Sequence, residues 1–272
     1  MRAAAIQMSS KPDREHNLGV ADRLVRAAAA AGAELVVLPE RWPVLGTPEQ
    51  TAAGAEPLDG PTARWASDVA AELGVDLVAG SFSERVPGRQ LGSNTCLHFG
   101  PAGELRAIYR KIHMFDVEVG DRVYRESDQD LPGEEVVVSR SGGGVGLGLA
   151  VCYDLRFPEL FRTQAVAGAR VLTLSSAFTA VTTPAHWEVL VRARAIEDQC
   201  FMVAANQVGE HAPGIASGGR SLIVDPWGVV LADARDAETF VIADLDLDRQ
   251  AEIRSSLPSL ANRRPGAYRV PA

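Results

Sequence analysis

The stretch "GLGLAVCYDLRFPEL" (Gly146–Leu160) changes character at Cys152, where an apolar run meets a charged segment that contains a proline. The apolar run predicts a buried β-strand. The segment "FPELFRTQAVAGA" that follows has the pattern of a helix, and "RVLTLSS" after it predicts another buried strand. This order of elements is typical of α/β proteins. It places Cys152 at the C-terminal tip of the first strand.

The same alternation of strands and helices extends along the whole chain. Helices are expected over Asp13–Gly32, with Asp13 as N-cap, and over residues 60–74, with Pro61 near the start. Two more helices are expected over residues 184–199 and 246–257. Strands or hairpins are expected over residues 3–8, 33–40, 75–82, 94–111, 134–151, 200–207, 219–233 and 238–245. Two sheets facing each other, with helices outside, would bury all these apolar strands.

The composition is that of an ordinary globular protein. The 272 residues are 46% hydrophobic and 23% charged, and the net charge is -8. This balance disfavours nucleic acid and anionic membranes as partners and favours a small-molecule enzyme. No break in composition divides the chain, so we expect one domain over residues 1–272. The apolar run near the start is too short for a signal peptide, and no window reaches the length of a membrane span, so we expect a cytoplasmic protein.

The cysteines do not form a recognisable framework. Cys96, Cys152 and Cys200 are odd in number and widely spaced, which does not indicate disulfides. The sequence has no CxxC motif and no histidine pair with zinc-like spacing, so we expect no structural metal.

Three reactive side chains follow predicted strands. Glu40 comes after "LVVLP", Lys111 after "LRAIYR" and Cys152 after "GLGLAV". Ligands bind at the carboxyl ends of strands in α/β sheets, so the three could share one cleft. There the carboxylate could take the thiol proton and the ammonium could stabilise an oxyanion. A strand-to-helix turn after Cys152 would add backbone N–H groups and a helix N-terminus beside the sulfur, and these would lower the thiol pKa.

Each of these residues also has an ordinary structural interpretation. A cysteine at a strand end is usually a small buried hydrophobe. A glutamate after a strand is usually solvated, and "YRK" reads as a charged edge. Taken singly, none of the three would indicate catalysis.

The sequence around them resembles a known family. "LVVLPE", "YRKIHMFD" and "GLAVCYDLRFPEL" resemble the three signature blocks of the carbon–nitrogen hydrolase (nitrilase) superfamily. The later segments "AHWEVLVRARAIEDQCFMVAANQ", "GRSLIVDPWGVVLA" and "LANRRPGAY" are similar to that family too. The resemblance covers nearly the whole chain and implies a four-layer α-β-β-α sandwich.

The resemblance also implies roles for individual residues. Glu40 becomes the general base, Lys111 the cation that stabilises the intermediate and Cys152 the nucleophile. The Tyr153 backbone N–H is expected to help bind the oxyanion. A second glutamate, Glu126 or less fittingly Glu118, is expected to orient the lysine and the substrate. The implied reaction passes through a thioester and uses neither metal nor cofactor.

Within the family, "YRKIHMFDVEV" and "TTPAHWEVLVRARAIEDQ" look most like the Nit group of amidases. These enzymes act on small amides that carry a carboxylate, such as 2-oxoglutaramate or deaminated glutathione. Binding a carboxylate needs a cation, and the nearby candidates are Arg156, Arg110 and Arg192, of which we expect at least two to form structural ion pairs. Phe178 and Thr179 are further candidates for substrate binding.

Alternatives remain open at this level. The chain could be an N-carbamoyl-amine hydrolase, an aliphatic amidase, a nitrilase or a catalytically silent scaffold. His186 suggests a Cys–His protease, although a capping or core role on its amphipathic helix is the simpler interpretation. His113, two residues after Lys111, is expected to support the site without taking part in the chemistry. The family resemblance and the arginine-rich C-terminal tail fit a homodimer or higher homo-oligomer.

Overall fold

The computed structural model describes residues 1–119 and 122–268. The six helices named among them are α1 (Arg14–Ala30), α2 (Pro48–Ala53), α3 (Pro61–Leu73), α4 (Pro158–Val166), α5 (Glu188–Asp198) and α6 (Leu247–Ser256). One sheet consists of β1 (Arg2–Gln7), β2 (Leu35–Val37), β3 (Asp76–Glu84), β4 (Ser93–Phe99), β5 (Leu105–Arg110) and β16 (Thr239–Asp244). The other consists of β8 (Val138–Arg140), β9 (Gly146–Val151), β10 (Val171–Ser176), β11 (Phe201–Asn206), β14 (Leu222–Val224) and β15 (Val230–Asp233).

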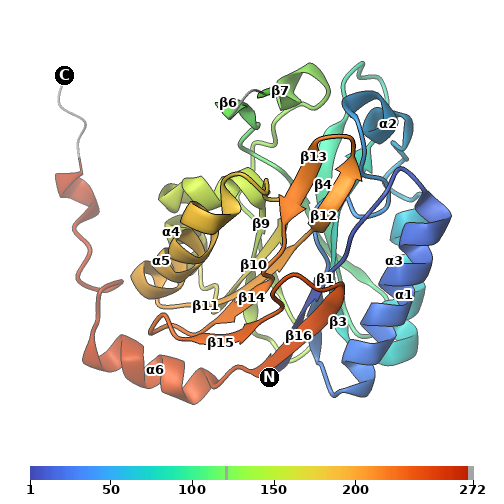
Figure 1. Cartoon of the computed structure of the whole chain (residues 1–272). Coiled ribbons are helices and arrows are strands. Elements are labelled where there is room, and N and C mark those ends of the chain that lie inside the picture. The colour runs from blue at the N-terminus through green and yellow to red at the C-terminus, as the bar shows by residue number, and fades with distance from the viewer. Residues whose placement is uncertain (120–121, 269–272) are drawn as a thin grey trace.

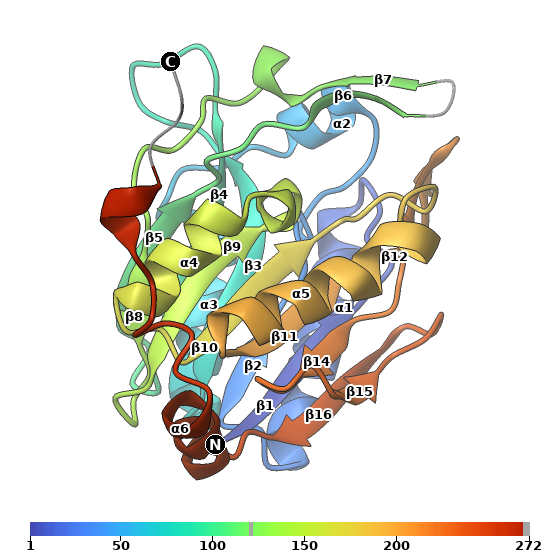
Figure 2. The ribbon, with the colours of Figure 1, turned by 90° about the vertical axis from the view of Figure 1, so that its left-hand side faces the viewer.

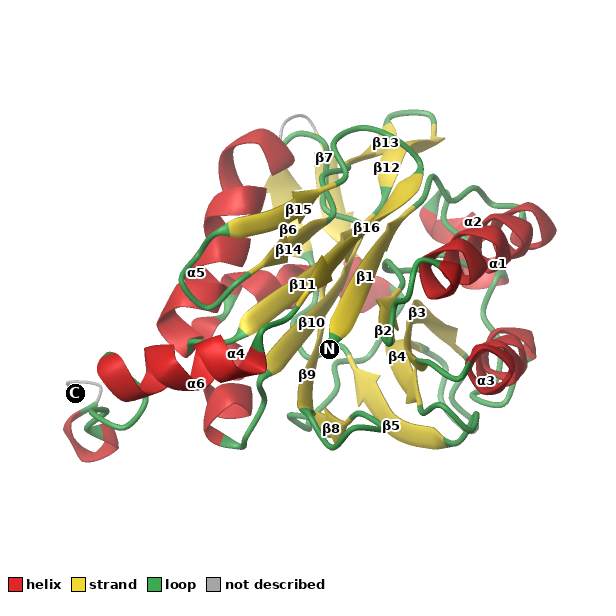
Figure 3. Cartoon of the chain, turned by 90° about the horizontal axis from the view of Figure 1, so that it is seen from below, coloured by secondary structure: helices red, strands yellow, loops and turns green. Residues whose placement is uncertain are grey.

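The two sheets pack face to face, and helices cover both outer faces (Figure 1). The strand order is β16-β1-β2-β3-β4-β5 in one sheet and β15-β14-β11-β10-β9-β8 in the other. Helices α1 and α3 lie on the first sheet, and α4 and α5 lie on the second, as the view from below shows (Figure 3). Figure 2 shows α4 and α5 in front of the sheet they cover. The predicted four-layer α-β-β-α sandwich is therefore confirmed.

The central strands β1 and β2 of the first sheet are buried on both faces, which explains why nearly all their residues are apolar. In β1, Ala3 and Ala5 belong to the core between the sheets, whereas Ala4 and Ile6 pack on the side of α1 and α3. Successive side chains of a strand point to opposite faces, so a strand with helices on one side and a sheet on the other needs apolar residues at every position.

The predicted helix ends agree with the structure. The Asp13 side chain accepts a hydrogen bond from the N–H of His16 and caps α1. Pro61 is the first residue of α3, and Gly74 ends that helix in the left-handed conformation with φ of 65°. The helix expected over residues 184–199 differs at its start, because Thr183–Trp187 forms a π-helical turn before α5.

Three small elements were not predicted from the sequence: α2, the hairpin of β6 (Asp116–Val119) and β7 (Arg122–Arg125), and the hairpin of β12 (Val208–Ala212) and β13 (Ile215–Gly218). They are short and partly exposed, so they carry little hydrophobic periodicity. All three gather at the upper end of the sandwich in Figure 1. Among the residues that the structure describes, no helix is both long enough and apolar enough to cross a membrane.

Candidate active site

The three residues at strand ends meet in one cavity. Glu40 follows β2, Lys111 follows β5 and Cys152 follows β9. These strands end at the same side of the sandwich, and all three side chains line a cavity of about 450 Å³. Residues of α2, of the β6–β7 hairpin and of β13 complete its walls. The structure thus brings together the groups that the sequence placed at separate strand ends.

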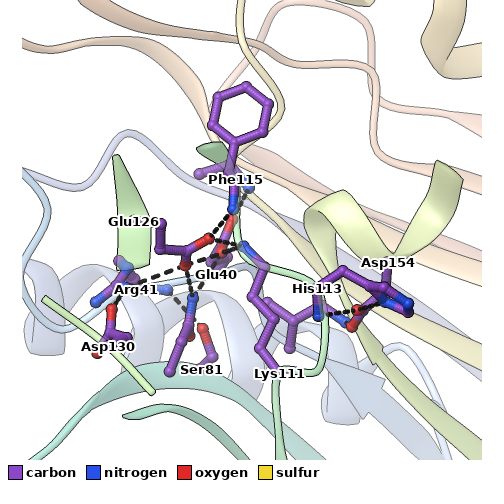
Figure 4. A network of polar contacts seen from close by, with 12 residues as sticks. Glu40, Arg41, Ser81, Lys111, His113, Phe115, Glu126, Asp130 and Asp154 are labelled. Atoms are coloured by element: carbon purple, nitrogen blue, oxygen red, sulfur yellow. Dashed lines mark hydrogen bonds and ion pairs between the residues drawn. The ribbon is translucent and has the colours of Figure 1, made fainter. Parts of the chain in front are cut away.

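Lys111 lies between two carboxylates (Figure 4). Its Nζ is 3.1 Å from Glu40 Oε1 and 2.8 Å from Glu126 Oε2. The lysine side chain is 2% exposed. Burial alone would lower the pKa of Lys111, but the charges of Glu126 and Glu40 outweigh it and raise that pKa. Lys111 therefore stays a fixed cation.

Glu40 is a buried carboxylate with a donor on each oxygen. Its Oε1 accepts from Lys111 and from Asn94 Nδ2 at 2.8 Å, and its Oε2 accepts from the N–H of Ala177 at 2.9 Å. Ala177 directly follows β10, so both sheets hold this carboxylate. Such fixed geometry suits a base that acts on a neighbouring thiol.

Cys152 occupies a strained backbone position at the tip of β9. Its φ is 46°, in the left-handed region that a non-glycine residue rarely adopts. At the opposite, N-terminal end of β9, a Cβ at Gly146 would lie 2.2 Å from the carbonyl oxygen of Gly168, so the strand must carry glycine there for close packing.

The helix expected from Phe157 onward begins at Pro158 as α4, after a short 3₁₀ turn over Cys152–Arg156. The expected direction of the Cys152 pKa is wrong. This pKa is raised rather than lowered, by burial and then by the charge of Glu40, against the opposing effect of Lys111. The resting thiol is therefore neutral, and its proton needs an acceptor.

A buried aspartate connects the nucleophile turn to the lysine loop. Asp154 Oδ2 accepts from Tyr109 Oη at 2.7 Å and from the N–H of Val151 at 2.8 Å. Its Oδ1 is 2.7 Å from His113 Nδ1. Tyr109 and His113 flank Lys111 in the sequence, so Asp154 fixes the two strand ends relative to each other. His113 has this supporting place, as expected, and its ring stacks on Phe157.

Of the two candidates for the second glutamate, Glu126 is the one that lies beside Lys111. It bonds Lys111, and its Oε2 accepts from the N–H of Phe115 at 2.8 Å. Glu118 is instead exposed, and its Oε1 lies 3.7 Å from Arg125 Nη2.

Tyr153 lies in the first turn after strand β9, where backbone N–H groups have no acceptor within the helix. Its ring packs edge-on against Phe115 at 5.0 Å in the cavity wall.

Of the three candidate arginines, only Arg156 lines the cavity. Arg110 pairs with Glu84 at 2.7 Å, and Arg192 donates to the carbonyl of Gly228 at 2.8 Å. These two have structural partners, as expected. Within residues 1–119 and 122–268, the polar side-chain partner of Arg156 is His186 and not a carboxylate.

Aromatic rings and a histidine surround Arg156. Its guanidinium lies 5.1 Å from the centre of the Phe178 ring and 3.3 Å from His186 Nδ1. Phe178 and Thr179 line the same cavity. Of the capping or core role expected for His186, the core role is wrong, because its side chain is exposed. It belongs to the π-helical turn that precedes α5.

Three residues of the site were missed at the sequence level: Arg41, Asn94 and Asp130. Asn94 Nδ2 bridges Glu40 and Glu126, at 2.8 and 3.1 Å. Arg41 contacts both Glu126 and Asp130. Their partners are far away in the chain, so no local pattern marks them. For Arg41, the only available signal is its position directly after Glu40.

Comparisons with known proteins agree with this architecture. The family model described as carbon-nitrogen hydrolase matches residues 2–255. A deaminated glutathione amidase from Bos taurus is 42% identical over 270 residues, which are 97% of this chain and 82% of the relative. An omega-amidase NIT2 from Xenopus tropicalis is 36% identical, over 99% of this chain and 97% of the relative. The crystal structure of the C. elegans NitFhit protein aligns with a TM-score of 0.90 at 35% identity, covering 98% of this chain and 66% of that longer one.

The fold and the family model define the class of protein. The chain belongs to the carbon–nitrogen hydrolase family. Its relatives place it more narrowly among the Nit-type members, and it is an amidase.

Proposed function

We propose that the chain hydrolyses a small amide that carries a carboxylate, of the deaminated glutathione or 2-oxoglutaramate class, with Cys152 as nucleophile. The observation that carries the proposal is the cavity in which Glu40, Lys111 and Glu126 surround a neutral, buried thiol. We further propose one catalytic domain over residues 1–272.

In the first half-reaction, Glu40 takes the proton of Cys152 as the sulfur forms a bond to the amide carbon. The carbonyl π electrons move to the oxygen, and Lys111 with the Tyr153 N–H stabilises the resulting oxyanion. When this intermediate collapses, the C–N bond breaks. Glu40 returns its proton to the leaving nitrogen, so ammonia or an amine departs and a thioester remains.

In the second half-reaction, Glu40 takes a proton from water as the water oxygen attacks the thioester carbon. Collapse of the second intermediate breaks the C–S bond and releases a carboxylic acid. Glu40 gives its proton to the sulfur, and the enzyme returns to its starting state. Glu126 accepts hydrogen bonds from Lys111 throughout and keeps the ammonium in place.

The charge of the cavity supports an anionic substrate. Among the described residues that line it, Lys and Arg outnumber the carboxylates, which are Glu40 and Glu126. Arg156 is the cation best suited to a substrate carboxylate, because aromatic rings and His186 surround it instead of an acid. The relatives named for deaminated glutathione and omega-amide hydrolysis support the same substrate class.

An assay of product release tests this proposal. The panel contains deaminated glutathione, 2-oxoglutaramate, an uncharged aliphatic amide, an N-carbamoyl amino acid and a nitrile. We expect turnover of the carboxylate-bearing amides, and Arg156→Gln should raise KM for them about 10- to 100-fold, since a charge-assisted hydrogen bond contributes roughly 1.5–3 kcal/mol.

The matched control is Arg192→Gln, an arginine on the outer face of α5, which should leave KM unchanged. Preference for a nitrile or an N-carbamoyl compound would replace the proposed substrate class. Absence of turnover on every compound would contradict the proposal and would favour the catalytically silent scaffold instead.

We also propose a cytoplasmic homodimer or higher homo-oligomer. Exposed apolar side chains of α5 and the neighbouring β14–β15 hairpin support the assembly: Val189, Ile196 and Trp227 are 66%, 48% and 58% exposed. The hairpin turn touches α5 at Ile196, so these side chains form one surface. Sedimentation of the full chain measures the assembly state.

A further inference from the structure

Arg41 follows the proposed base in the sequence but serves the other glutamate. Its Nη2 is 3.3 Å from Glu126 Oε1 and also donates to Asp130, and its Nη1 donates to Ser83 Oγ at 2.5 Å. The arginine side chain is 10% exposed, and Asp130 is buried beside it. Figure 4 shows this guanidinium between Glu126 and Asp130.

The backbone at Arg41 is held in an unusual conformation. Its φ is 49°, in the left-handed region, and its N–H donates to Ser81 Oγ at 3.1 Å. Such a conformation costs free energy and persists only where the surroundings enforce it. Here it lets two consecutive side chains reach the same network, with Glu40 on Lys111 and Arg41 on Glu126.

Glu126 uses both of its oxygens fully. Oε1 accepts from Lys111, Asn94 and Arg41, and Oε2 accepts from Lys111 and the N–H of Phe115. Two of these donors, Lys111 and Arg41, are cations. Lys111 is shared with Glu40, so Arg41 is the cation that Glu126 does not share with the proposed base.

We propose that Arg41 is a positioning residue that keeps Glu126 ionised and fixed, so that the Lys111 ammonium stays between Glu126 and Glu40. Asp130 in turn orients Arg41. The effect of Arg41 on catalysis rests on the proposed function, in which Glu40 is the base and Lys111 stabilises the oxyanion. If Glu126 became neutral, Lys111 would pair with Glu40 alone, and both the base and the oxyanion cation would be misplaced.

The titration of Glu126 agrees with this arrangement. Burial alone would raise the pKa of Glu126, but the charges of Lys111 and Arg41 outweigh it and lower that pKa to about 2. The other charged groups facing the network are Glu40 and Asp130, which both oppose ionisation. Removing Arg41 should therefore raise the pKa of Glu126, so that this carboxylate takes up a proton at a higher pH than in the wild type.

The test is the pH profile of amide hydrolysis by the full chain carrying Arg41→Gln, Arg41→Lys, Asp130→Asn or both Arg41→Gln and Asp130→Asn. We expect Arg41→Gln to lower kcat about 10-fold or more with a smaller change in KM. Its acidic limb should move up by about one pH unit or more, the effect of one nearby opposite charge. Arg41→Lys should stay near the wild-type profile.

The Asp130 variants separate positioning from simple stabilisation of a buried ion pair. Asp130→Asn leaves the Arg41 charge on Glu126 and removes a like charge that opposes its ionisation, so its acidic limb should stay where it is or move to lower pH. The double variant also removes the Asp130 carboxylate that Arg41→Gln leaves without its arginine, and its acidic limb should stay above that of the wild type. If Asp130→Asn is as damaging as Arg41→Gln and the double variant restores the wild-type profile, the pair is only structural and the inference is wrong.

Two controls complete the design. Arg162→Gln removes an arginine from the buried Asp198 elsewhere in the molecule and should leave the acidic limb unchanged. The pH dependence of Cys152 alkylation by iodoacetamide follows the same network without any substrate. If the wild type hydrolyses no amide, the proposed function fails, and a shifted alkylation profile in Arg41→Gln would still support the positioning role while an unshifted one would overturn it.

Discussion

Two buried cysteines at opposite ends of one sheet have different surroundings. Cys152 follows the C-terminal end of β9, and Cys200 precedes the N-terminal end of β11, which runs parallel to β9 in the same sheet. Burial raises the pKa of both thiols, that of Cys200 to about 12. Cys152 faces a carboxylate and a cavity, whereas Cys200 donates to the carbonyls of Asp198 and Ala169 and accepts from Arg254 Nη2 at 3.1 Å.

Buried carboxylates in the same two regions, Glu126 and Asp198, also differ. Lys111 and Arg41 lower the pKa of Glu126 to about 2, whereas burial raises the pKa of Asp198 to about 7 despite Arg162 at 3.0 Å. Glu126 is therefore held in its ionised form, whereas Asp198 resists ionisation. A buried thiol is therefore reactive here only because a base and open space accompany it.

The sharpest test removes each thiol in turn. Cys152→Ala should abolish turnover, by at least about 10⁴-fold, because no covalent intermediate can form. Cys200→Ala should keep kcat within about 2-fold and lower the free energy of unfolding by about 1–2 kcal/mol through lost packing. Steady-state kinetics and urea unfolding measure both effects. Near wild-type rates in Cys152→Ala would show that Cys152 is not the nucleophile.

The next test removes the base and keeps its shape. Glu40→Gln retains a side chain that can bond Lys111 and Asn94 but cannot take a proton. We expect kcat to fall about 10²- to 10⁴-fold, the usual contribution of general base catalysis. Circular dichroism serves as the control for folding. A loss below about 3-fold would assign the base role to another group.

The smallest expected effect concerns stability and pH at the Cys200 end. The folded state binds the Asp198 proton more tightly than the unfolded state, so this contribution is complete below about pH 4 and is lost as pH rises through about 7. Between pH 5 and 8, Asp198→Asn should gain roughly 1–3 kcal/mol relative to the wild type.

A second carboxylate provides the control for this measurement. Arg26 and Trp65 hold the pKa of Asp22 below its usual value, so Asp22→Asn should differ from the wild type by a constant amount over the same pH range. Urea unfolding at each pH gives both comparisons. An Asp198→Asn difference that is equally constant would show that this carboxylate ionises normally in the folded state.

Much of the site could be predicted from the sequence because its groups follow strands whose apolar patterns are strong. Glu40, Lys111 and Cys152 each terminate such a run, and parallel strands place those ends together. Arg41 and Asp130 could not be found in this way, because they are 89 positions apart and neither ends a predicted strand. The direction of the Cys152 pKa was also missed, because it depends on burial and on the distance to Glu40.

The sequence by itself determined the layers of the molecule and the strand ends that carry the reactive groups, since hydrophobic periodicity is a local property. Only the tertiary structure decided how those groups act on one another. Whether Arg156 has an acid beside it, which cation Glu126 keeps for itself and which of two buried thiols meets a base all depend on contacts between segments far apart in the chain. Electrostatic interaction depends on distance and burial, and the fold alone sets both.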